Sequence, residues 1–244
     1  MRLLAVLLLV APLSLRADAL TDLRATLAQF AANTPAHGSF EVTSSSTNSD
    51  EGHAFEGKAS VGFEVSDAGL RILYPKATLA QTNREARLEA ADPDRQTPAR
   101  SGMSRVRALE LADLLDAGAM LNIDLLNAQL IEAKATSYQA KPGRLIITKL
   151  SPKASKGSSK HVKSIDSRLS VWLGDDGVPI AAERNVSVKA SFMLMSFEHN
   201  QKDNWTFARA GDRLVATHHE QIQKSDGFGQ HDTSRVVQVV RLEP

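Results

Sequence analysis

Hydrophobic and polar residues alternate along most of the chain after residue 35, which is the pattern of half-buried β-strands. In residues 55–65 the apolar side chains of Ala59, Val61 and Phe63 fall on one face, and a turn ending in Gly69 precedes a second β-prone run. This arrangement predicts a hairpin. Asp-Gly at 176–177 is a further hairpin signal. Other β-like segments cover residues 39–43, 129–138, 144–150, 165–173, 178–190, 192–200, 205–210, 213–224 and 233–242.

Helical periodicity occurs in two places. Residues 21–30 bring Leu23, Leu27 and Phe30 onto one stripe, with Thr21 as a helix start. Residues 104–117 and 120–126, with Gly118 as the break, form the most apolar helical stretch. Residues 80–91 could be helical but lack an apolar stripe, and residues 92–102 predict a loop.

The expected fold class is α+β. About ten short strands with one apolar face need a cover. We therefore expect a curved, mostly antiparallel sheet, a half-open β-barrel, covered on its concave face by two or three helices.

The first nineteen residues have the pattern of a secretory signal peptide. Arg2 precedes an unbroken apolar run at residues 3–10, and residues 17–19 give a small-x-small cleavage motif. The run is shorter than the roughly 20 residues that span a membrane. We predict cleavage after Ala19, a periplasmic or secreted location, no transmembrane segment in the mature chain, and one domain over residues 20–244 with a helical insertion around 104–127.

Charge and cysteine content exclude several classes of function. The full chain has 29 basic and 28 acidic residues, and the leader removes Arg2, Arg16 and Asp18, so the mature charges balance. A nucleic-acid binder normally shows a basic excess, so we expect no nucleic-acid partner. The absence of cysteine excludes disulfides, thiolate metal sites and a cysteine nucleophile.

Residues 218–220, His-His-Glu, are the one histidine cluster that suggests chemistry. On a strand His218 and Glu220 share a face, and His231 across a hairpin could complete a zinc site. The other interpretation is polar residues on a wet face, and the lack of any fixed zinc-binding spacing favours it. There is also no G-x-S-x-G elbow, and Asp175 and Asp176 suit a turn. We predict no enzymatic activity, no cofactor and no metal.

Met193, Leu194, Met195 and Phe197 form the most unusual apolar strand of the chain. Methionine side chains suit adaptable apolar cavities, although ordinary core packing is the alternative. A pocket between sheet and helices is expected to be lined mainly by apolar groups. Its candidate ligand-binding residues are Leu114, Leu121, Leu125, Met193, Met195 and Phe197.

The basic, Ser- and Gly-rich segment at residues 153–163 is interpreted as a solvated loop between strands. Its four lysines leave a second interpretation open. They could touch an anionic membrane surface or a partner with an acidic patch.

The layout resembles the periplasmic lipoprotein carriers, the LolA/LolB-like superfamily. The shared features are the leader, the helix at residues 21–30, the Gly-Ser-Phe-Glu-Val strand at 38–42, the Phe-Glu-Gly-Lys-Ala strand at 55–59, a helical insertion and a long meander. The chain lacks the tryptophan-bearing strand and the Asp-Gly-Lys strand turn of close carriers. The resemblance implies a curved sheet closed by helices around an apolar cavity.

Two hypotheses about function follow. The chain is an exported soluble binding or carrier protein for an apolar ligand, either a lipid or lipoprotein acyl chains. The alternative is a non-enzymatic envelope interaction or assembly module with a protein partner and no small ligand. The sequence does not decide the oligomeric state.

Overall fold

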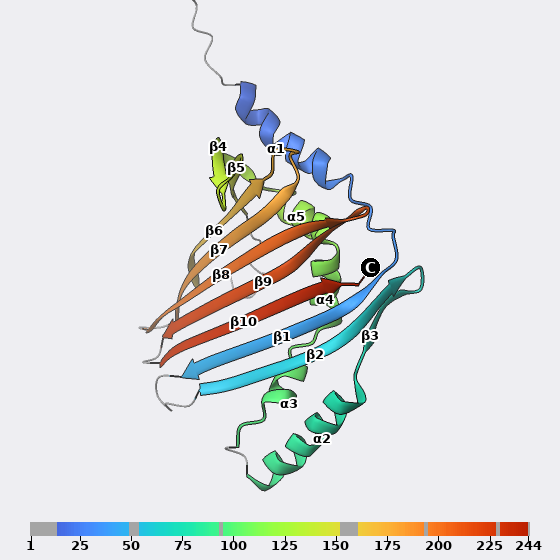
Figure 1. The fold of residues 1–244 in the computed structure, drawn as a ribbon. Coiled ribbons are helices and arrows are strands. Elements are labelled where there is room, and N and C mark those ends of the chain that lie inside the picture. Colours follow the sequence, from blue (N-terminus) through green and yellow to red (C-terminus); the bar gives the residue numbers. More distant parts are fainter. Residues whose placement is uncertain are drawn as a thin grey trace, which may run out of the picture.

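The computed structural model describes residues 14–48, 54–92, 95–151, 161–192, 195–227 and 230–243. Its strands are β1 (Ala36–Asn48), β2 (Ala54–Ser66), β3 (Gly69–Leu73), β4 (Gln129–Tyr138), β5 (Lys141–Lys149), β6 (Val162–Leu173), β7 (Pro179–Phe192), β8 (Met195–Ala210), β9 (Arg213–Gly227) and β10 (Gln230–Leu242). They form one antiparallel sheet in the order β3-β2-β1-β10-β9-β8-β7-β6-β5-β4 (Figure 1). Strands β3 and β4 are its two edges and do not pair with each other, so the sheet is open.

Helices pack against one face of this sheet, which confirms the predicted α+β class. They are α1 (Ser14–Leu27), α2 (Lys76–Ala91), α3 (Pro98–Met103), α4 (Ala108–Leu115) and α5 (Ala117–Leu125). Helices α4 and α5 contact β9, α1 contacts α5 and β4, and α3 contacts β2. Helix α2 packs on α3, beyond the β2–β3 edge of the sheet (Figure 1). We call the helix-covered side the inner face and the opposite side the open face.

Strand alternation puts the core on the inner face. Phe40 of β1, Phe63 of β2 and Leu169 of β6 are almost fully buried there, and Leu23 and Leu121 bury the facing sides of α1 and α5. Burial of apolar area at about 25 cal/mol per Å² is the main source of stability in a domain without disulfides.

Residues 98–103 form α3, so the loop predicted for residues 92–102 is wrong in its second half. Pro98 stands at the start of this helix, where its missing N–H costs nothing. Gly102 lets the helix approach β2 closely, because a Cβ added there would lie 2.2 Å from the carbonyl carbon of Lys58.

The predicted bounds of the other helices need smaller corrections. Helix α1 begins at Ser14 rather than Thr21, and the break between α4 and α5 falls at Asp116 rather than Gly118. The Asp116 carboxylate accepts a hydrogen bond from the backbone N–H of Ala119 (3.1 Å), which caps α5.

The expected cleavage point after Ala19 lies within α1, and residues 1–13 lie outside the described part of the chain. No helix among the described residues has the length and apolar character needed to cross a membrane.

Candidate functional site

A pocket of about 490 Å³ lies between the α4–α5 hairpin and strands β7 to β10 on the inner face. Leu114 of α4, Met120 and Ile123 of α5 and Val236 of β10 give it apolar walls. The rest of its lining is polar and charged. The site therefore combines apolar and polar surfaces, in contrast to the mainly apolar lining expected from the sequence.

Asp203 of β8 is the most deeply buried charged group in this pocket, with no exposed surface. Its Oδ2 accepts two hydrogen bonds from the guanidinium of Arg184 on β7 (3.1 Å each) and one from the amide of Gln201 (2.8 Å). Its Oδ1 accepts one from Gln221 of β9 (2.9 Å) and lies 3.2 Å from Nε2 of His219. Both oxygens are thus fully satisfied, as a buried carboxylate requires.

These partners keep Asp203 ionised. Burial acts to raise the pKa of this carboxyl, but the hydrogen bond from His219, the charge of Arg184 and the amides of Gln221 and Gln201 outweigh it and lower the pKa to about 2. Asp203 is therefore a fixed negative charge at neutral pH.

His219 sits between two acceptor oxygens. Besides Asp203, its Nδ1 lies 2.8 Å from Oε1 of Gln238 on β10. The Gln238 amide nitrogen donates to the carboxylate of Glu110 on α4 (2.9 Å), which fixes the amide orientation with its oxygen toward the histidine. The His219 ring also stacks on Trp205, with centroids 4.9 Å apart and planes within 4°.

The hydrogen bonds continue into the second helix. Arg184 also donates to the carboxylate of Asp124 on α5 (3.1 Å), and its guanidinium carbon lies 5.3 Å from the centre of the Trp205 ring. A continuous network thus joins α5, β7, β8, β9, β10 and α4. It fixes where the helical hairpin docks on the sheet.

The pKa values of two acidic groups on the α4–α5 hairpin are shifted in the opposite direction to that of Asp203. Burial raises the pKa of Asp124, against the lowering effect of Arg184. Burial, followed by the nearby charges of Glu110 and Asp116, raises the pKa of Asp113. The helical side of the pocket therefore carries negative charge at an electrostatic cost.

An apolar strip continues from the pocket along the inner face of β6, β7 and β8. Pairing aligns Val188 of β7 with His199 of β8, and Ala190 with Phe197. Phe197 stacks on His199, with centroids 6.4 Å apart and planes within 6°. The strip consists of Ile165, Val186, Val188, Ala190 and Phe197, all partly buried. The helices make their main contacts with β9, β4 and β2 rather than with β6, β7 or β8.

The structure places the predicted ligand-binding residues in three different settings. Leu114 lines the pocket, while Leu121 and Leu125 are fully buried in the core cluster away from it. Phe197 lies on the apolar strip. Met193 is outside the described residues, and the side chain of Met195 is also outside them.

The histidine cluster does not assemble. His218 and Glu220 share the open face, as expected from strand alternation, while His219 points inward. His231 pairs with Asp226, eight residues along β9 from His218. Among the described residues no group of three or more His, Asp or Glu side chains is placed to hold a metal ion.

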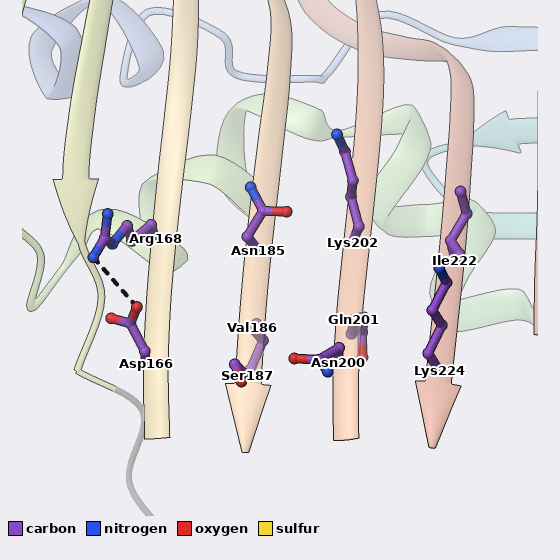
Figure 2. A pocket seen from close by; sticks show the side chains of 10 residues that line it. All are labelled: Asp166, Arg168, Asn185, Val186, Ser187, Asn200, Gln201, Lys202, Ile222 and Lys224. Carbon is purple, nitrogen blue, oxygen red and sulfur yellow. Dashed lines mark ion pairs between the residues drawn. The ribbon is translucent and has the colours of Figure 1, made fainter. Parts of the chain in front are cut away.

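The open face carries a second depression, a trough of about 570 Å³ across β6 to β9 (Figure 2). Two of its three cations have partners nearby: Arg168 lies 3.4 Å from Asp166, and Lys202 lies 2.8 Å from Glu183. Exposed pairs of this kind contribute little energy and are typical of a solvated sheet face. The trough is therefore a weaker candidate than the inner-face pocket.

The sequence did not reveal the network around Asp203. Arg184, Asp203 and His219 lie on three strands, and their spacing follows from hairpin lengths that no motif encodes. One signal was available: Asp203 stands two residues before Trp205, on the same side of a strand and hence facing the core.

Comparison of the sequence with protein-family models and with curated proteins finds no match.

Proposed function

We propose that this chain is an exported, non-enzymatic carrier that binds the apolar chain of a lipid or lipoprotein on the inner face of its sheet. The observation that supports this most directly is the partly buried apolar strip from Ile165 to Phe197, on strands that are not the main contacts of the helices. The strip adjoins a pocket of about 490 Å³ with apolar walls and a polar, charged base. An amphiphile likewise combines an apolar chain with a polar headgroup.

The pocket suggests how such a ligand lies. An acyl chain would pack against Val186, Val188 and Phe197, where each buried CH₂ group gains about 0.8 kcal/mol. A polar headgroup would face the mouth of the pocket near Arg105 and Arg107. The resemblance to LolA/LolB-like carriers implies a curved sheet closed by helices around an apolar cavity, and the packing of helices on one face of the sheet agrees with the first part of that expectation.

Binding of a fluorescent fatty acid tests the proposal with two matched variants of β7. Val188→Asp places a charge on the apolar strip, and Ser187→Asp places the same charge on the open face one residue away. A buried unpaired carboxylate is strongly disfavoured. We expect Val188→Asp to weaken binding at least about tenfold, or about 1.4 kcal/mol, and Ser187→Asp to bind like the unmodified protein.

Circular dichroism and thermal unfolding of both variants control for loss of fold. Equal affinity in the two folded variants would rule out the strip as the binding surface. Absence of fatty-acid uptake and of co-purified lipid would overturn the carrier proposal. Capture of one defined envelope protein by cross-linking would then favour the assembly-module alternative.

A further inference from the structure

An aromatic pair stands on the open face, away from the core. Trp172 of β6 and Tyr138 of β4 lie with ring centroids 5.6 Å apart and planes tilted by 46°. Aromatic residues make up only 5% of the chain, and the surrounding open-face positions are mostly polar. The pair borders a hollow of about 420 Å³, whose lining shares only Trp205 with that of the inner-face pocket.

The hollow has a structural origin in two irregularities of strand pairing. The β6–β7 register shifts between Trp172 and Leu173, and the β8–β9 register shifts between Thr206 and Phe207. Such bulges bend a strand locally and are frequent beside binding sites. Ala181 pairs with Trp172 on one side and Thr206 on the other, so the smallest side chain of this row lies between them.

Polar side chains from three strands complete the hollow. Glu183, Asn204 and Glu220 stand side by side on β7, β8 and β9, because Glu183 pairs with Asn204 and Asn204 with Glu220. The Asn204 amide lies 3.4 Å from the Glu220 carboxylate. Thr206 and His218 pair in the adjoining row. Acceptors and donors are therefore both available within one hollow.

Both carboxylates are acceptors at neutral pH. The hydrogen bond from Arg235, against the raising effect of burial, lowers the pKa of Glu220. Burial acts to raise the pKa of Glu183, but the hydrogen bonds from Lys202 and Asn185 outweigh it and lower the pKa. Neither residue holds a proton to donate as a general acid, so the arrangement suits binding rather than hydrolysis.

We propose that this hollow binds a neutral pyranose sugar, as one unit of a glycan, with Trp172 as its stacking platform. A pyranose ring presents a face of C–H groups that packs on an aromatic ring, and its equatorial hydroxyls point outward in the ring plane. Glu183 and Glu220 accept hydrogen bonds from such hydroxyls, while Asn204 donates. A uronic acid carboxylate accepts hydrogen bonds but donates none, so it cannot pair with the carboxylates of Glu183 or Glu220 at this position.

Isothermal titration with three trisaccharides tests the proposal. Cellotriose and N-acetylated chitotriose are the neutral probes, and trigalacturonate is the anionic one. We expect at least one neutral probe to bind the unmodified protein, and trigalacturonate to bind at least about tenfold more weakly. Trp172→Ala is expected to lower the affinity for that neutral probe about tenfold or more, equivalent to about 1.4 kcal/mol.

Two further variants make the test decisive. Lys224→Ala changes the trough of Figure 2 outside the hollow and should leave sugar affinity unchanged. Trp172→Phe keeps a flat aromatic ring and should retain most of the binding, so it separates loss of stacking from loss of fold. Failure of both neutral trisaccharides to bind, or equal binding by the folded Trp172→Ala variant, overturns the proposal. Neither result affects the lipid-binding proposal, which concerns the opposite face.

Discussion

At the scale of single residues, Asp203 is the group whose surroundings are most specific. It has no exposed surface, and four neighbouring side chains donate hydrogen bonds to it. Asp203→Asn keeps the shape of the side chain but removes the charge that Arg184 and His219 face. Arg184 keeps its contact with Asp124 in this variant but loses its charge-assisted hydrogen bonds to Asp203. Because disruption of a buried ion pair is costly, we expect a loss of about 3 kcal/mol in the free energy of unfolding, measured with urea.

A matched control for this variant lies on the open face. Asp166 pairs with Arg168 at 3.4 Å, but its side chain is 54% exposed. Solvent screens that pair, so Asp166→Asn should change the free energy of unfolding by less than about 1 kcal/mol. Similar losses in the two variants would contradict a special role for the inner-face network.

At the scale of elements, the docking of α3 on β2 depends on Gly102. In an ordinary helix interior Gly→Ala adds stability of about 0.5–1 kcal/mol. Here the added Cβ would lie 2.2 Å from the carbonyl carbon of Lys58, so α3 must move away from the strand. We expect Gly102→Ala to destabilise the protein by about 1–3 kcal/mol, as overpacking does. Thermal unfolding measures this, with Ser101→Ala in the same helix as the control.

The contrast between α3 and the strands shows what local sequence can predict. The alternation in residues 55–65 and the Asp-Gly pair at 176–177 are signals that act over a few neighbouring residues. The first correctly predicted strand β2. The second correctly predicted a turn, in which Gly177 adopts a positive φ of 77°. The local signals in α3 conflict, because Pro98 suits a helix start while Gly102 disfavours a helix interior. Gly102 also meets a strand more than forty residues earlier, a contact that no local pattern encodes.

The same limit applied to the candidate site. Leu114, Leu121 and Leu125 were identified from helical periodicity, which shows that they are buried but not which of them faces a cavity. Only Leu114 does. The polar groups of the pocket come together through the strand register, and register follows from turn geometry and loop lengths along the meander.

At the scale of the whole molecule, one sheet presents two chemically distinct surfaces. The inner face carries the apolar core together with the network around Asp203 and the His199–Ser225 hydrogen bond, and the open face carries several exposed ion pairs and the aromatic pair at Trp172. Successive residues along a strand point to opposite faces of the sheet. The two proposals therefore predict effects that adjacent substitutions, such as those at 187 and 188, can separate.

The buried network also makes stability depend on pH in a way that one variant can isolate. A carboxyl whose folded-state pKa is about 2, against about 3.9 in an unfolded chain, stabilises the fold above the unfolded value and loses that contribution as the pH falls toward 2. The loss is roughly 2 kcal/mol. Asp113 and Asp124 act in the opposite sense, because their raised pKa values favour the folded state on acidification.

The total pH profile mixes these contributions. The difference between the unmodified protein and Asp203→Asn removes the contribution of Asp113, and it leaves that of Asp203 together with the smaller effect of the Asp203 charge on Asp124. We expect this difference in the free energy of unfolding to stay constant from pH 7 to about 5 and to shrink by roughly 2 kcal/mol between pH 5 and 2. Urea unfolding at a series of pH values measures it. Parallel curves down to pH 2 would show that Asp203 does not hold its charge in the folded protein.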